Sequence, residues 1–367
     1  MGSQADRRSA ASRWCRPLAV LWMESVAERM ADYLVGHYPR VPRLCQAKQA
    51  PVAARGLIHT LHAPRLSARP RVRRGPCGQP GAPACNRASI GGHTIAVASV
   101  LMPTAAVNGI EISYSDTGGA GPAVVLSHGF LLDQSMFDAQ VAALAPGWRV
   151  ITWDERGHGG TRATGPFTYW DCAQDLLGLL DRLGAGRAVL AGMSQGGFLS
   201  LRAALTAPER VRGLVLIDSE AGSEDPAVAP AYEQLHQTWL GQGPGPVQEI
   251  VASIILGPGR WDSWYAKWQD QYAQWSPDDL GQLTWPFRCL RDRDDITGRL
   301  GEITCPALIL HGTADAAIPV TKAETVRDGL GGPVTFTVIE GAPHASNVTH
   351  PEQVNEAILN FLRMLDE

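Results

Sequence analysis

Short apolar runs alternate with amphipathic segments along the chain from Val107 onward. The apolar runs are rich in Val, Ile and Leu and fall at 123–127, 149–153, 188–191, 213–217, 307–310 and 335–339. Apolar residues recur at helical spacing between most of them, at 170–183, 197–206 and 322–330. Continuous apolar strands separated by helices predict an α/β fold with a mostly parallel, doubly wound sheet. The stretch 107–115, with a turn at 116–119, is expected to form a leading hairpin strand.

The alternation breaks between residues 221 and 304, where six of the eleven tryptophans gather. Trp261, Trp264 and Trp268 are spaced so that three indoles share one helix face. This stripe either packs onto the main domain or, in part, roofs an apolar substrate cavity. Core packing is the favoured role for individual tryptophans, and Trp264 and Trp268 are the candidates for substrate contact.

The sequence Gly-Met-Ser-Gln-Gly at 192–196 is the single GxSxG of the chain and directly follows the apolar run 188–191. The pattern alone is common, but between a strand and a helix it has a mechanical reason. A sharp turn strains the serine backbone, and the flanking glycines permit the turn sterically. The hydroxyl then stands at a helix start, where the dipole favours developing negative charge. Ser194 is therefore the predicted nucleophile.

A serine hydroxyl needs a base, and the base needs an orienting carboxylate. Among the six histidines after residue 101, His344 follows the last apolar run, on a loop that can reach the serine. His350 is the competitor, but it precedes Pro351 where the last helix begins. Asp315, after the run 307–310, is the favoured acid, and Asp218, after 213–217, is the alternative.

The negative charge of a reacting carbonyl oxygen also needs donors. Main-chain N–H groups of Phe130 and Gln195 are the candidates, because Phe130 follows the apolar strand at 123–126 and Gln195 follows the serine. The neighbouring residues His128, Gly129 and Met193 are candidate substrate contacts.

Other features point away from metal and thiol chemistry. Asp292, Asp294 and Asp295 alternate with arginines, which predicts a solvated charged face and not a metal site. The seven cysteines are widely spaced without a CxxC pair, which favours reduced thiols in a cytoplasmic protein. No uncharged apolar stretch reaches about 18 residues, so no membrane span is predicted. No metal or organic cofactor is implied.

Residues 1–101 differ in composition from the remainder. They carry 15 Lys+Arg against 4 Asp+Glu, whereas the remainder carries 17 against 32. The arm is rich in Arg and Pro, and only 18–35 has helical spacing. We expect a disordered tail or an untranslated upstream stretch, with Met102 as the alternative start. The functional alternatives are a tether to nucleic acid or to an anionic membrane, and a targeting segment. The acidic body is not expected to bind nucleic acid.

Over residues 107–365 the motifs resemble the α/β-hydrolase superfamily. His128-Gly129 looks like the oxyanion loop, and 154–159 (Asp-Glu-Arg-Gly-His-Gly) looks like a structural turn of the family. Ser194, Asp315 and His344 stand in the family order. The chain is most similar to the bacterial group of small-ester esterases, enol-lactonases and cofactor-free haloperoxidases. One departure is Gly160-Thr161, where many relatives have a larger residue followed by Ser.

This resemblance implies a cap inserted after the sixth strand. The expected organisation is a hydrolase core at 102–220 and 305–367 with a Trp-rich cap at 221–304, acting as a monomer or weak homodimer on a small, largely apolar ester or lactone. The alternatives are C–C hydrolysis or perhydrolysis by the same triad, and a slow-turnover ligand receptor. Product analysis separates the first two, and sustained turnover excludes the receptor.

Overall fold

The computed structural model describes residues 87–90, 93–96, 102–257, 263–273 and 275–366. Within the arm, β1 (Arg87–Ile90) pairs antiparallel with β2 (His93–Ala96). The composition of the arm did not predict this hairpin. The missed signal is the Gly-Gly dipeptide between the two strands, because glycine pairs favour two-residue hairpin turns. The predicted helix at 18–35 and the rest of the predicted tail lie outside the described residues.

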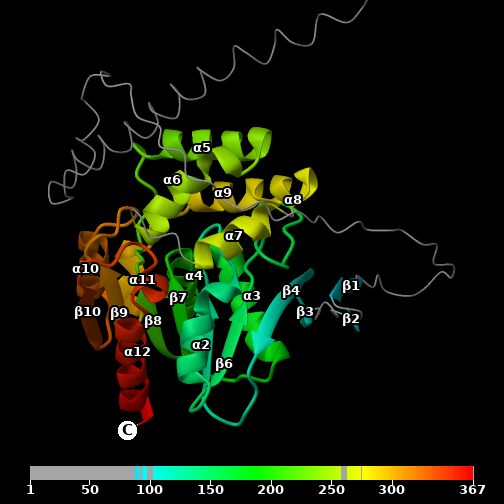
Figure 1. Cartoon of the computed structure of the whole chain (residues 1–367). Coiled ribbons are helices and arrows are strands. Elements are labelled where there is room, and N and C mark those ends of the chain that lie inside the picture. Colours follow the sequence, from blue (N-terminus) through cyan, green and yellow to red (C-terminus); the bar gives the residue numbers. More distant parts are fainter. Residues whose placement is uncertain (1–86, 91–92, 97–101, 258–262, 274, 367) are drawn as a thin grey trace, which may run out of the picture. The chain divides into compact units, whose positions relative to one another are not determined.

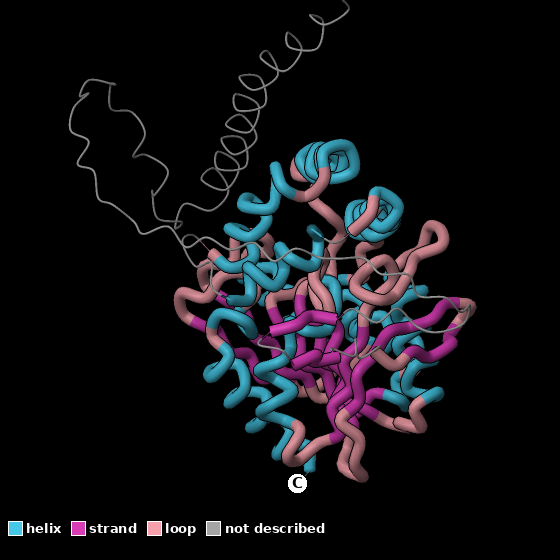
Figure 2. The backbone as a smooth tube through the Cα atoms, turned by 45° about the vertical axis from the view of Figure 1, so that its right-hand side comes forward, coloured by secondary structure: helices cyan, strands magenta, loops and turns pink. Residues whose placement is uncertain are grey.

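The body is built on an eight-stranded sheet with the strand order β10-β9-β8-β7-β5-β6-β4-β3 (Figures 1 and 2). Strands β5 to β10 are parallel, and β3 and β4 are antiparallel at one edge. The predicted mostly parallel sheet is thus confirmed. The strands are β3 (Thr104–Val107), β4 (Ile110–Asp116), β5 (Ala123–Ser127), β6 (Arg149–Trp153), β7 (Ala188–Met193), β8 (Val211–Ile217), β9 (Ala307–Gly312) and β10 (Val334–Ile339).

The turn of the leading hairpin differs from the prediction. It lies at Asn108-Gly109, between β3 and β4, and not at 116–119. Both turn residues have positive φ, 48° and 79°. Asn-Gly is the dipeptide that best accepts this conformation, so the signal was present in the sequence.

Each face of the sheet carries its own hydrophobic core, because successive strand side chains point to opposite sides. In β5, Val125 belongs to one core, while Val124 and Leu126 belong to the other, and all three side chains are fully buried. Helices α3, α4 and α10 contribute to the first core, and α2 and α12 to the second. These helices span α2 (Asp138–Leu144), α3 (Tyr169–Arg182), α4 (Gln195–Thr206), α10 (Val320–Gly329) and α12 (Pro351–Asp366), with the short α11 at Ser346–Thr349.

A helical insertion joins β8, the sixth strand of this sheet in chain order, to β9. It comprises α5 (Ala229–Gln242), α6 (Gly245–Leu256), α7 (Ser263–Ala273), α8 (Pro277–Gln282) and α9 (Thr284–Arg291). Figure 1 shows these helices gathered over one end of the sheet. Three 3-10 segments lie elsewhere in the described part of the chain: η2 (Gln134–Phe137), η3 (Pro208–Arg210) and η4 (Thr297–Glu302). Among the helices in the described ranges, none has both the length and the apolar character needed to cross a bilayer.

Candidate active site

Ser194 stands on a sharp turn between β7 and α4. Its backbone has φ 52° and ψ −117°, a left-handed conformation that is strained for a serine. A Cβ on Gly192 would overlap the main chain of Gly196, and one on Gly196 would overlap the Ser127 carbonyl. The turn can close this tightly only because both positions are glycine. The Ser194 side chain is presented at the start of α4, as the strand–turn–helix pattern predicts.

His344 and Asp315 are joined by a hydrogen bond, with His344 Nδ1 2.8 Å from Asp315 Oδ2. Both side chains come from loops at the ends of neighbouring strands, β10 and β9. Because a carboxylate accepts, Nδ1 carries the proton and Nε2 is left as the basic atom. Burial opposes protonation of the ring, but the Asp315 carboxylate outweighs it and raises the pKa of His344 above 6.5. Ser194 and His344 line the same pocket.

Asp218, the alternative acid, is engaged elsewhere. Its Oδ1 accepts from the Gly312 amide at 2.7 Å and its Oδ2 from the Ser346 amide at 3.0 Å. Burial, partly offset by His311, raises the pKa of Asp218 to about 6. The residue thus ties the loop that carries His344 to the end of β9, and the geometry favours Asp315 as the partner of His344.

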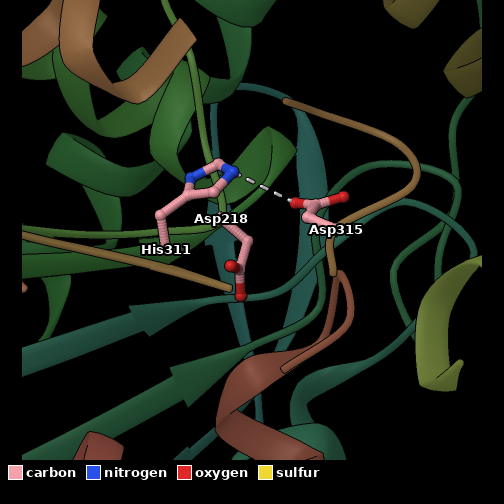
Figure 3. Close-up of side chains that lie close together, drawn as sticks. All are labelled: Asp218, His311 and Asp315. Atoms are coloured by element: carbon pink, nitrogen blue, oxygen red, sulfur yellow. Dashed lines mark ion pairs between the residues drawn. The ribbon is translucent and has the colours of Figure 1, made fainter. Parts of the chain in front are cut away.

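Asp218, His311 and Asp315 lie close enough together to resemble a metal-binding cluster (Figure 3). The carboxylate oxygens and His311 Nε2 are already used in hydrogen bonds, whereas His311 Nδ1 has no partner among the described residues. His311 Nε2 lies 2.8 Å from the Ile318 carbonyl and 3.4 Å from Asp315 Oδ2. Asp315 Oδ1 accepts from the Ala317 and Ile318 amides at 2.8 and 2.9 Å. This donor set explains the cluster as a scaffold that holds the Asp315 carboxylate in place for His344.

Two observations bear on the predicted oxyanion donors, the main-chain N–H groups of Phe130 and Gln195. Within the described residues, neither the Phe130 nor the Gln195 main-chain N–H donates to a protein acceptor. Gln195 is the first residue of α4, where N–H groups have no partner within the helix. Phe130 lines the same pocket as Ser194.

The loop that carries Phe130 is fixed by the helical insertion. Leu131 has a positive φ of 61°, and its carbonyl accepts hydrogen bonds from Trp268 Nε1 at 2.7 Å and the Tyr272 hydroxyl at 2.8 Å. Both donors belong to α7. Trp268 is buried and does not line the pocket beside Ser194, and its indole N–H contacts this loop. The side chain of Trp264, the other candidate, lies outside what the structure describes.

The pocket above Ser194 encloses about 720 Å³, part of it open to solvent. Of the predicted substrate contacts, Gly129 and Met193 line it. Helices α5 and α6 of the insertion form its roof with aliphatic side chains and one tyrosine. None of the tryptophans of the insertion lines the pocket in the described part of the chain. The other apolar lining residues are Leu131, Leu132, Phe198, Leu235, Val251, Ile254, Ile255, Leu290, Ala317 and Ile318, with Tyr232 beside them.

His128 does not line the pocket and is fully buried. Its Nε2 accepts from the Glu155 amide at 2.9 Å, and its Nδ1 lies 2.8 Å from the Gly129 carbonyl. Burial lowers the pKa of His128 to about 4, so the ring is neutral and donates through Nδ1. This side chain holds the Gly129 backbone next to Phe130 from below the pocket surface.

Sequence analysis missed the charged wall of the pocket. Arg293 lies within the charged run that was expected to form a solvated face, yet its side chain is only 3% exposed and lines the pocket with Glu220 and Glu224. The solvated-face prediction is wrong at Arg293, although Asp292 and Asp294 are exposed as expected. Glu220 could have been predicted as a pocket residue from the sequence, because it stands two residues after Asp218, close to the end of the apolar run 213–217.

Glu155 was also missed. It is 1% exposed and accepts at Oε2 from the side-chain amide of Gln195 at 2.7 Å, and Gln195 in turn accepts from the Tyr169 hydroxyl at 3.2 Å. Glu155 Oε1 has no hydrogen-bond partner among the described residues. Burial raises the pKa of Glu155 well above 4.5, because an apolar environment disfavours the charged carboxylate.

Glu155→Gln is therefore expected to change the pH dependence of stability. In the wild type the unfolded carboxyl ionises above about pH 4.5 while the folded one stays protonated, so Glu155 destabilises the fold progressively as pH rises. Glutamine cannot ionise. The free energy of unfolding of the variant, minus that of the wild type, should increase as the pH rises above about 4.5 in urea titrations. A difference that is independent of pH would show that Glu155 is not protonated in the fold.

Comparison with known proteins agrees with this geometry. Residues 122–257 match the family model of the alpha/beta hydrolase fold. A Variovorax paradoxus protein named as the carbamate hydrolase RutD is 32% identical over 255 residues, which cover 66% of this chain and 92% of that protein. An esterase from Thermogutta terrifontis is 30% identical with a TM-score of 0.64, over 72% of this chain and 97% of the esterase. The enol-lactonase from Burkholderia xenovorans is 27% identical with a TM-score of 0.63, over 71% and 100% of the two chains.

The chain therefore belongs to the α/β-hydrolase superfamily, as its motifs predicted. Its homologues are hydrolases of the esterase and lactonase kind, and the protein is a hydrolase of this family.

Proposed function

We propose that the protein hydrolyses a carboxylic ester or lactone of a small, largely apolar substrate through an acyl-enzyme on Ser194. The observation that carries the proposal is the His344–Asp315 hydrogen bond at 2.8 Å, next to a strained Ser194 in the same pocket. A neutral His344 with its proton fixed on Nδ1 is the tautomer that a serine nucleophile requires.

The reaction takes place in two halves. Ser194 Oγ attacks the carbonyl carbon and transfers its proton to His344 Nε2, and the Phe130 and Gln195 amides stabilise the oxyanion. The C–O bond then breaks, and the leaving alcohol takes the proton from His344. In the second half His344 removes a proton from water, the hydroxide attacks the acyl-enzyme, and the acid product leaves as Ser194 regains its proton.

The lining of the pocket supports the substrate class. Aliphatic side chains from both the core and the insertion surround Ser194, and such surfaces favour apolar acyl or alcohol groups. The relatives are named esterase, enol-lactonase and carbamate hydrolase. Esters, lactones and carbamates all have a carbonyl carbon bonded to a leaving heteroatom. Esters and lactones are therefore the first substrates to test, with carbamates beside them.

The test is a steady-state assay with straight-chain p-nitrophenyl esters of increasing acyl length, aliphatic lactones, a carbamate, a diketone, and acetate with hydrogen peroxide. We expect sustained turnover with short esters or lactones. Turnover of the diketone but not of the esters or lactones would indicate C–C hydrolysis. Turnover of acetate with peroxide but not of the esters or lactones would indicate perhydrolysis. A single stoichiometric burst with retained ligand would instead indicate a receptor.

A further inference from the structure

The pocket beside Ser194 is apolar except on one wall. Glu220, three residues after the end of β8, and Arg293, two residues after the end of α9, meet there in an ion pair of 2.7 Å, and both side chains are at least nine-tenths buried. Arg293 also forms an ion pair of 2.8 Å with Glu224. A charged group in an apolar pocket fixes the orientation of a ligand, so this wall is the place where substrate selectivity is expected.

The guanidinium of Arg293 is already neutralised. Besides the two carboxylates it donates to the Gly222 and Leu290 carbonyls, each at 3.0 Å. An anionic substrate group placed here would meet two carboxylates around one guanidinium. The wall is therefore not a binding site for a carboxylate or phosphate, although it contains an arginine.

The two glutamates differ in what their second oxygen does. Glu224 binds Arg293 through Oε2 and accepts from the Asp225 amide at Oε1, at 3.0 Å. Glu220 binds Arg293 through Oε1, but its buried Oε2 accepts no hydrogen bond from any described residue. The Lys322 ammonium forms an ion pair with this oxygen at 3.5 Å, beyond hydrogen-bond length, from a side chain that is 46% exposed.

A buried carboxylate oxygen without a donor is costly, and the cost is removed when a ligand supplies the donor. Arg293 and Lys322 already supply two positive charges around Glu220, so a third cation is not favoured there. The missing partner is a neutral donor.

We propose that Glu220 Oε2 accepts a hydrogen bond from a hydroxyl or amide N–H of the substrate. The preferred substrates are then apolar esters or lactones that carry one neutral hydrogen-bond donor away from the scissile carbonyl, and anionic analogues are rejected. This inference rests on the proposed function, because the donor would lie in the same pocket as Ser194. Sites that hydrogen-bond a substrate hydroxyl discriminate strongly against analogues that lack it.

The experiment compares kcat/KM for p-nitrophenyl esters whose acyl chains have equal length and end in a methyl, a hydroxyl or a carboxylate group. A second series carries the same three groups on the alcohol. In one of the two series the wild type should prefer hydroxyl over methyl, and methyl over carboxylate. Glu220→Gln can keep its bond to Arg293 through Oε1, but then places an N–H where Oε2 stood. The preference for hydroxyl over methyl should therefore fall by about tenfold or more.

Glu224→Gln is the matched control, because it removes the same charge from the same guanidinium and leaves Glu220 Oε2 unchanged. It should retain the preference for hydroxyl over methyl, while its rejection of the carboxylate ester weakens as in Glu220→Gln. Thermal unfolding of both variants checks that the Arg293 contacts still support the fold. An equal loss of the preference for hydroxyl over methyl in the two variants, or no preference for hydroxyl in either series, overturns the inference.

Binding separates this inference from the proposed function. The dissociation constants of the same esters are measured by calorimetry with Ser194→Ala, alone and combined with Glu220→Gln. Tighter binding of the hydroxyl ester that depends on Glu220, without turnover by the wild type, would remove the proposed function and keep the inference. Turnover by the wild type with no Glu220-dependent selectivity would do the opposite.

Discussion

Replacement of Ser194 by alanine is expected to lower kcat/KM for the best ester substrate by on the order of 10⁴-fold or more, because the members of a triad act as a unit. The tight turn after β7 presents the Ser194 side chain to the pocket. Alanine removes the hydroxyl that is the proposed nucleophile. The measurement is steady-state hydrolysis of the wild type and the variant in parallel.

The fold should survive this change. Alanine has the same Cβ as serine, so it meets the left-handed backbone at residue 194 with no added strain. We expect the free energy of unfolding to change by less than about 1 kcal/mol. Activity close to that of the wild type in a folded Ser194→Ala protein would refute the assignment of the nucleophile.

Asp315→Asn is expected to lower kcat by roughly 10³- to 10⁴-fold, as asparagine in this place favours the wrong tautomer of the catalytic imidazole. It should also displace the acid limb of the pH–rate profile. The Asp315 carboxylate raises the pKa of His344 against the effect of burial, so its loss makes protonation harder and moves that limb to lower pH. A pH profile of kcat/KM for both proteins measures the displacement.

Asp218→Asn is the comparison that decides between the two acids. Asp218 accepts from the Gly312 and Ser346 amides, and an asparagine can satisfy only one of them. The loss should appear mainly as about 1–3 kcal/mol of unfolding free energy, with a smaller effect on turnover than that of Asp315→Asn. The reverse ranking in activity would make Asp218 the catalytic carboxylate.

The fold was predictable because its cause is local. Continuous apolar runs give strands buried on both faces, and helical spacing between them gives the covering helices. The leading hairpin was predicted with its turn at 116–119, but the turn lies at Asn108-Gly109, which is the stronger turn signal. The positions of Ser194 and His344 followed from the order of elements, because parallel strands bring their carboxyl ends to one edge of the sheet.

The substrate pocket was less predictable because its members are determined by long-range packing. Trp268 was a candidate for substrate contact, and in the structure its indole N–H donates to the carbonyl of Leu131, which is distant in sequence. Arg293 has the sequence pattern of a solvated residue, and only its partners Glu220 and Glu224 explain its burial. Periodicity does not encode such pairings, so the charged wall could be recognised only from the structure.

The central claim is that Ser194 is the nucleophile that His344 activates, and covalent labelling tests it most directly. The wild type, Ser194→Ala and His344→Ala are treated with a fluorophosphonate, and the modified peptide is identified by mass spectrometry. The account predicts one adduct per chain on Ser194, none on Ser194→Ala, and strongly slowed labelling of His344→Ala. An adduct on a different residue, or labelling that proceeds equally fast without His344, would contradict it.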